Sequence, residues 1–218
     1  MQSGRERSIS ENEPPLQGEN FPARTAFARM KCPSCATSFE APESRCPTCR
    51  ISLQKLDLKF GMVPRHSRFL ADRSGRLTLP EMEELRQSLR LFEKKFPQIL
   101  FSVFIAELPP DGSASEYAFW LANRGRFSSQ ERKQADNFDL LLVIDVTSES
   151  VALTTGYGLE KHVSEEDLEE ALQAAESQWR DGDLAQGIQS CIDFLVRRMR
   201  VLAAKARHQE LDLVEIGE

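Results

Sequence analysis

Residues Asp139–Glu160 read DLLLVIDVTSESVALTTGYGLE and give the clearest indication of the fold. It opens with an apolar run at residues 140–144, which is too short for a helix and typical of a strand buried on both faces. A polar turn at residues 147–150 leads to Val151–Thr155, where β-branched side chains alternate with others. The two runs predict a β-hairpin that ends at the glycine-rich segment 156–158, because glycine allows the chain to turn sharply after a strand.

Helix and strand patterns alternate on either side of this hairpin. Thr78–Glu81 has capping-box spacing, and the apolar residues after it recur every three or four positions, which indicates an amphipathic helix. Residues 99–106 form another apolar strand pattern, and Ser113 and Ser164 each begin a further helix. The last helix carries a long apolar stripe. Strands flanked by helices in this way predict a small mixed sheet that helices cover on both faces.

Short motifs accompany these elements. They are an Asp-x-x-Gly-x-Leu motif at Asp72, Gly75 and Leu77, the pair Asp136-Asn137, the segment Gly156–Glu160 and the helix start Ala185-Gln186-Gly187. Their order and spacing over residues 69–201 resemble the TPM domain family. The resemblance implies an α/β/α sandwich. Some members of the family resemble acid phosphatases, and some bind divalent cations through loop carboxylates.

The resemblance also implies a site where strand ends meet loops. Its candidate catalytic or cation-binding residues are Asp72, Asp136 and Asn137, and its candidate binding residues are Gly156, Tyr157, Gly158 and Glu160. Carboxylate and amide oxygens suit a hard cation, so Ca²⁺ or Mg²⁺ is the cofactor expected there. The alternative is that Asp72 and Asp136 only cap turns.

Some residues near this site differ from what a phosphatase needs. Phe138 stands where the family usually has glycine, and Glu165 is the acidic residue nearest to the position of a family aspartate. The acidic first turn of the helix after Ser164 would repel a bare phosphate. His162 could act as an acid or base, or it could be a surface residue. Cys191 lies within the apolar stripe of the last helix, so we expect a buried, inert thiol.

Two C-x-x-C motifs precede these elements, Cys32-Pro-Ser-Cys35 and Cys46-Pro-Thr-Cys49, with ten residues between them. Four thiolates at this spacing suit one tetrahedral cation, and the pattern resembles a zinc ribbon. We expect structural Zn²⁺, with iron, a redox pair or disulfides as the alternatives. Disulfides are disfavoured where the cytosol keeps thiols reduced. Because four protein ligands fill the coordination sphere, this zinc would hold a fold together and would not catalyse.

Composition divides the chain into parts. The predicted parts are a disordered tail at 1–29, the zinc ribbon at 30–60, a linker at 61–68, a TPM-like domain at 69–207 and an acidic tail at 208–218. Within the ribbon, apolar and polar residues alternate over Ile51–Phe60, which predicts a closing strand. His66 lies in the linker, where a histidine is usually solvated. We expect the ribbon and the TPM-like domain to be separable units.

Charge and hydropathy restrict the function. Residues 1–70 carry a net charge of +4 and residues 71–218 one of −10, so the main domain lacks the basic surface of a nucleic-acid-binding protein. No segment approaches the ~18 apolar residues of a membrane span. The N-terminal segment has no apolar run of a secretory signal, so we expect a cytoplasmic protein.

Two functions fit this sequence. The first is a non-catalytic adaptor, an assembly or maintenance factor that binds other proteins in a complex. The second is a weak, divalent-metal-dependent phosphatase that hydrolyses a phosphomonoester with Asp72 and Asp136 as metal ligands. Bound cation at these carboxylates would favour the enzyme.

Overall fold

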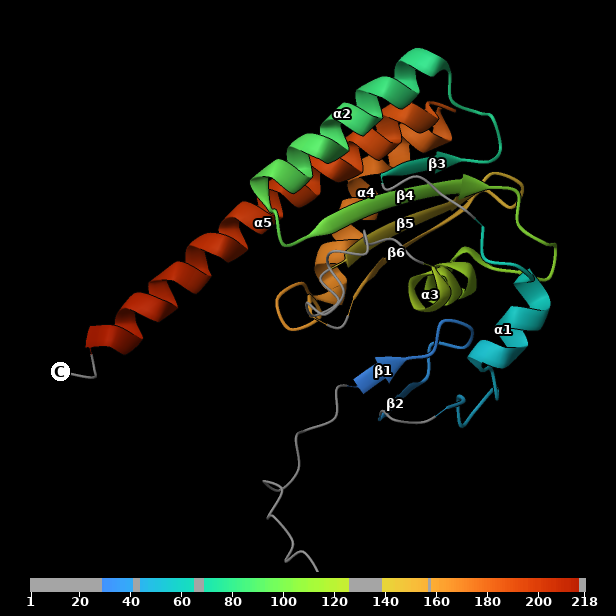
Figure 1. Cartoon of the computed structure of the whole chain (residues 1–218), viewed down its shortest axis with the longest axis horizontal. Coiled ribbons are helices and arrows are strands. Elements are labelled where there is room, and N and C mark those ends of the chain that lie inside the picture. Colours follow the sequence, from blue (N-terminus) through green and yellow to red (C-terminus); the bar gives the residue numbers. More distant parts are fainter. Residues whose placement is uncertain (1–28, 41–43, 65–68, 126–138, 157, 216–218) are drawn as a thin grey trace, which may run out of the picture.

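The computed structural model describes residues 29–40, 44–64, 69–125, 139–156 and 158–215 (Figure 1). At its centre is a four-stranded sheet in the order β3-β4-β5-β6. The strands are β3 Leu70–Asp72, β4 Leu100–Ala106, β5 Asp139–Asp145 and β6 Ser150–Thr155. The first three pair in parallel and β5 pairs with β6 in antiparallel fashion, so the sheet is mixed, as predicted.

The hairpin of β5 and β6 is confirmed, with Leu142 facing Leu153 across the pair. Its turn depends on Asp145, whose side chain is only 2% exposed. The Asp145 carboxylate accepts hydrogen bonds from the Thr147 amide, the Ser148 hydroxyl and the Leu108 amide. Burial works against the charged form of Asp145, but these hydrogen bonds outweigh it and hold the pKa of the carboxyl below its usual value. This carboxylate therefore ties the hairpin to the loop after β4.

Helices cover both faces of the sheet (Figure 1). They are α2 Leu79–Lys95, α4 Glu165–Arg180 and α5 Leu184–Glu215 on one face, and α3 Ala114–Arg124 on the other. The side chains of β4 are buried on both sides because Phe101 and Ile105 face the first layer, while Leu100 and Phe104 face α3. The predicted α/β/α sandwich is confirmed.

The helix starts follow the predicted caps. The Thr78 and Ser164 side chains each accept a hydrogen bond from the amide three residues on, and each forms a full capping box. At the far end of the chain, the backbone of α5 remains helical to Glu215, within the predicted acidic tail at 208–218, whose boundary stays a prediction. Ala, Arg, Lys, Glu and Leu dominate the last turns, and their high helix propensity explains the continuation.

Gly187 is required by the packing of α4 against α5. A Cβ atom at this position would lie 2.2 Å from Nε1 of Trp179. Gly187→Ala should therefore destabilise the protein by about 1–3 kcal/mol in urea unfolding, whereas at an open helix position the same change stabilises by up to about 1 kcal/mol. In a Trp179→Ala background the cost should shrink. A stabilising Gly187→Ala in the otherwise unchanged protein would show that the two helices are less closely packed.

The N-terminal region contains a two-stranded sheet and a helix. β1 Arg29–Lys31 pairs with β2 Ser38–Glu40, and α1 spans Leu53–Phe60. The predicted closing strand over residues 51–60 is therefore wrong. The Ser52 side chain caps α1 by accepting from the Lys55 amide, and the Gly61 N–H closes the last turn on the Asp57 carbonyl. In so short a segment, apolar residues four positions apart fit both a helix and an alternating strand, and the caps are compatible with the helix.

α1 packs against α3 of the main domain. Leu56 is 1% exposed and lies in the same hydrophobic cluster as Trp120. The Phe60 ring meets Tyr117 edge-on, with centroids 4.8 Å apart. Beside these rings, the Lys59 ammonium lies 2.7 Å from the Glu116 carboxylate, which is 9% exposed. Through these contacts the N-terminal region packs against α3 of the main domain, although the predicted linker separates the two in sequence.

Asp57 adds a polar link between α1 and α3. Its carboxylate accepts hydrogen bonds from both the Arg124 guanidinium, at 2.9 and 2.7 Å, and the buried Trp120 Nε1, at 2.9 Å. The Arg124 and Trp120 hydrogen bonds lower the pKa of the Asp57 carboxyl. A lowered folded-state pKa stabilises the fold above the unfolded pKa, and this stabilisation is lost as pH falls through the folded pKa.

Asp57→Asn keeps an acceptor for Trp120 but removes the charge that titrates. The wild type should be more stable than Asp57→Asn above about pH 4, the ordinary range of an aspartate, and the difference should shrink as pH falls below it. Urea unfolding midpoints between pH 3 and 6 measure this difference. A difference that does not change with pH would show that the Arg124 pair does not stabilise the fold.

Candidate functional site

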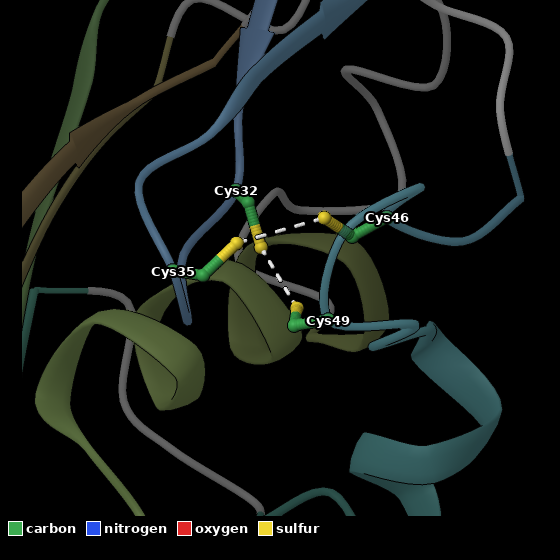
Figure 2. A group of neighbouring side chains, drawn as sticks. All are labelled: Cys32, Cys35, Cys46 and Cys49. Atoms are coloured by element: carbon green, nitrogen blue, oxygen red, sulfur yellow. Dashed lines mark hydrogen bonds between the residues drawn. The ribbon is translucent and has the colours of Figure 1, made fainter.

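The four N-terminal cysteines lie together at the tips of two similar turns (Figure 2). In each turn the amide of the first cysteine donates to the carbonyl five residues on, and its carbonyl accepts from the amide four residues on. The four bonds are Cys32 N to Thr37 O, Ala36 N to Cys32 O, Cys46 N to Ile51 O and Arg50 N to Cys46 O, at 2.9 to 3.0 Å. Ala36 and Arg50 occupy equivalent left-handed positions, with φ of 58° and 62°. The two motifs therefore form the same local structure twice.

The sulfur atoms converge on one centre. Cys32 Sγ lies 3.5 Å from Cys49 Sγ, Cys35 Sγ lies 3.7 Å from Cys46 Sγ, and all four sulfurs lie within 4.8 Å of one another (Figure 2). Zinc–sulfur bonds of about 2.3 Å in a tetrahedron place the sulfurs about 3.8 Å apart. The spacing therefore fits a single tetrahedral metal ion, and the predicted convergence of these cysteines is confirmed.

The surroundings favour thiolate at only some of these positions when no metal is bound. The hydrogen bond that joins Cys35 Sγ and the Thr37 hydroxyl oxygen, 3.3 Å apart, and a second one with the Thr37 amide lower the pKa of Cys35 to about 6. Burial raises the pKa of Cys32 to about 12. A bound divalent cation deprotonates a coordinating thiol outright. Metal binding would therefore convert the buried Cys32 to the thiolate that a four-sulfur site needs.

A cleft of about 570 Å³ lies along the outer edge of β6. Its apolar floor comes from the strand and from the helices on either side, with Leu153 from β6, Phe119 from α3 and Leu172 from α4. Gly156 lies at the end of β6 and lines the cleft together with Glu160. Two of the predicted binding residues, Gly156 and Glu160, therefore line this cleft, and Gly158 does not. Tyr157 lies outside the described residues.

The rim of the cleft is acidic. Asp139, Glu160, Glu165 and Glu169 line it, and Lys31 is the one cation among the described lining residues. Lys31, at the end of β1, pairs with Glu165, and this contact raises the pKa of the Lys31 ammonium. Loss of hydration raises the pKa of the Glu160 carboxyl. The cleft thus combines residues of the N-terminal region with those of the main domain and has an excess of negative charge.

Asp72 lies at the end of β3, where its side chain organises the following turn. Oδ1 accepts from the Ser74 amide and hydroxyl and from the Gly75 amide, and Oδ2 accepts from the Leu77 amide. This arrangement is the turn cap that was the alternative to cation binding. Asp136 and Asn137 lie outside the described residues, so their role as ligands stays a prediction.

The remaining candidate residues are a cysteine and two histidines. Cys191 is fully buried in α5, as predicted, and burial raises the pKa of its thiol to about 12. Its lack of reactivity stays a prediction. His162 is exposed near the start of α4, and its role as acid or base stays a prediction. His66 lies outside the described residues.

Sequence reasoning missed several structural carboxylates and the cleft. Asp145 is followed by Thr147 and Ser148, and this Asx-turn signal could have identified its role. The Lys59–Glu116 pair joins residues 57 positions apart, which no local pattern shows. The cleft likewise forms between α3, β6 and α4, which are separate in sequence.

Comparisons with known proteins identify the family of this chain. A family model of the TPM domain matches residues 70–198. The chain belongs to the TPM domain family. No curated protein sequence matches the chain. Among the helices of the described residues, none is long and apolar enough to cross a membrane.

Two solved structures share the fold of this TPM protein. One is the N-terminal domain of a protein from P. gingivalis, with 20% identity and a TM-score of 0.52, covering 69% of this chain and 88% of that one. The other is the BA42 protein of the psychrophilic bacterium Bizionia argentinensis, with 14% identity and a TM-score of 0.51, covering 60% of this chain and 86% of that one. At these identities the likeness concerns the fold alone.

Proposed function

We propose that this TPM protein is a non-catalytic adaptor, in which a structural zinc ion holds the N-terminal region and the main domain binds another protein in a complex. The observation that carries the proposal is the four-sulfur cluster. Cys32, Cys35, Cys46 and Cys49 would fill all positions of a tetrahedral zinc ion, which leaves none for water or substrate. Zinc bound in this way supplies folding energy and holds the two turns together.

The surroundings of the TPM-like site also support a binding role. The Asp72 carboxylate already accepts four hydrogen bonds from its own turn, three at Oδ1 and one at Oδ2. The first turn of α4 contains Glu165, Glu166 and Asp167, and of these Asp167 closes the Ser164 cap and pairs with Arg198. Negative charge at a helix N-terminus stabilises the helix and opposes a phosphate there.

A metal-dependent phosphatase remains the second candidate, because an acidic cleft can attract a divalent cation. Asp139, Glu160 and Glu169 line the cleft at its edge. A cation bound beside them could offset their repulsion of a phosphomonoester. This function would also need Asp136 and Asn137.

Hydrolysis of p-nitrophenyl phosphate by the zinc-loaded protein separates the two functions. We expect no turnover with or without millimolar Mg²⁺ or Ca²⁺, and no change in melting temperature upon cation titration. A specific site would stabilise the domain by about 2.7 kcal/mol at a hundredfold excess of cation over Kd. Cation-dependent turnover and stabilisation that are both lost in Asp136→Asn would establish the phosphatase instead.

A further inference from the structure

β6 is an edge strand whose outer side faces the cleft. Among the described residues, β6 pairs only with β5, and it ends the sheet order. In Figure 1 it lies at the margin of the sheet, next to α3. Its residues are half-buried between the flanking helices, except Ala152, which is buried. Sheet edges that avoid pairing carry proline, bulges or inward-pointing charges, or are covered by another segment. Among the described residues of β6 there is no such feature, and its outer side faces the cleft.

The ladder shows which backbone groups of β6 point outward. The Gly156 amide donates to the Asp139 carbonyl at 2.8 Å, so this facing pair is a hydrogen-bonded one. In an antiparallel ladder such pairs alternate with non-bonded pairs, and the residues of the latter direct their N–H and C=O groups away from the partner strand. The residues that point outward are therefore Val151, Leu153 and Thr155.

These outward groups are spaced as an added strand requires. Every second residue of β6 offers one donor and one acceptor to the cleft, over the length of the strand. The side chains beside them supply apolar contacts, since Leu153 lies toward α4 and Phe119 lies on the α3 side. Main-chain pairing gives affinity in this mode of recognition, and the flanking side chains give specificity.

The charge of the cleft indicates which kind of ligand it can bind. Four carboxylates and one ammonium group, that of Lys31, line the cleft, and Lys31 already pairs with Glu165. A basic segment complements this rim. A second copy of this chain would bring two acidic rims together, and its main domain is itself strongly acidic. A small anion would meet the same repulsion.

We propose that the β6 cleft binds an extended basic segment of a partner protein by strand addition, with lysine or arginine beside apolar residues. This inference rests on the proposed adaptor function and names the kind of partner that the adaptor holds. The added strand would pair with Val151, Leu153 and Thr155, while its basic side chains meet Glu160 and Glu169.

The first experiment uses a nine-residue fluorescent peptide of alternating valine and lysine with the full chain. We expect saturable binding by fluorescence anisotropy, weakened by salt, and at least about tenfold weaker binding of the same peptide with glutamate in place of lysine. Glu169→Gln should weaken binding of the lysine peptide several-fold. Glu170→Gln, on the same helix but outside the cleft lining, should not. Equal effects of the two variants would overturn the inference.

The second experiment tests the backbone pairing itself. Thr155→Pro removes an outward N–H and leaves the bonds to β5 intact, as proline on a sheet edge does. It should weaken peptide binding about tenfold or more, whereas Thr155→Val should bind normally. Amide exchange by NMR should show that the peptide protects the amides of Val151, Leu153 and Thr155. Unchanged exchange at these amides, or equal binding by Thr155→Pro, would overturn strand addition.

The oligomeric state provides the remaining outcome. If sedimentation finds a dimer that Thr155→Pro dissociates, a second copy occupies the edge and the inference is wrong. Failure of the peptide to bind, with phosphomonoester hydrolysis still absent, would overturn the strand-addition inference and leave the adaptor function standing. Cation-dependent hydrolysis would overturn the adaptor function, whatever the peptide does.

Discussion

Removing zinc from the purified protein should unfold the cysteine turns and leave the four-stranded sheet folded. Among the residues from 31 to 50 whose burial is described, only Cys32 and Cys46 are buried. So small a region depends on its metal, and apparent zinc-binding free energies in comparable peptides are about 10–16 kcal/mol. We expect chelation to abolish amide protection in the two turns, as measured by NMR hydrogen exchange.

Cys46→Ser should have the same effect as chelation, because three thiolates hold zinc less tightly than four. The matched control is Cys191→Ala, which changes the one cysteine that lies far from the cluster in sequence and is buried in α5. This variant should lose stability from the cavity it leaves but keep one zinc per chain in elemental analysis. Turns that remain protected without metal, or a Cys46→Ser protein with full zinc content, would contradict the structural role.

Leu56→Ala should destabilise the whole main domain by about 2–5 kcal/mol. Leu56 belongs to α1 but is 1% exposed, in a cluster with side chains of α3, β4 and β5. Its loss leaves a cavity between α1 and the sheet, so the effect should appear in the global urea transition, monitored by the fluorescence of Trp120 and Trp179 together.

Leu58→Ala is the matched control on the same helix. Leu58 is 88% exposed, so its removal should change stability by less than about 0.5 kcal/mol. Equal effects at the two positions would show that α1 does not pack against α3. The predicted linker at residues 61–68, between the zinc ribbon and the TPM-like domain, stays a prediction. It requires that α1 detaches from the main domain when the metal is removed. If Leu56→Ala destabilises the main domain both in the zinc-loaded protein and after chelation, α1 belongs to the main domain instead.

The parts of the fold that could be predicted depend on local signals. The buried run of β5, the polar turn and the alternating β6 lie next to one another, so the hairpin is encoded within a single stretch. The caps at Thr78 and Ser164 likewise act within three residues. The cysteines were predictable because each C-x-x-C turn positions its own pair of sulfurs.

The parts that could not be predicted depend on contacts between distant segments. α1 was predicted as a strand because a short amphipathic window fits two periods, and the packing of Leu56 against α3 favours the helical one. The outer edge of β6 carries no sequence signal, since any strand can end a sheet. Its acidic cleft forms only when Glu160 and Glu169 from the α4 region lie beside Lys31 from β1.

X-ray absorption spectroscopy at the zinc edge reports the ligands of the metal and so tests whether the zinc is structural. We expect four sulfur ligands at about 2.3 Å and no oxygen or nitrogen ligand in zinc-loaded, reduced protein. Such a site is closed and structural. Three or fewer sulfurs with an oxygen ligand would show an open coordination position, and this result would contradict a purely structural metal in a non-catalytic adaptor.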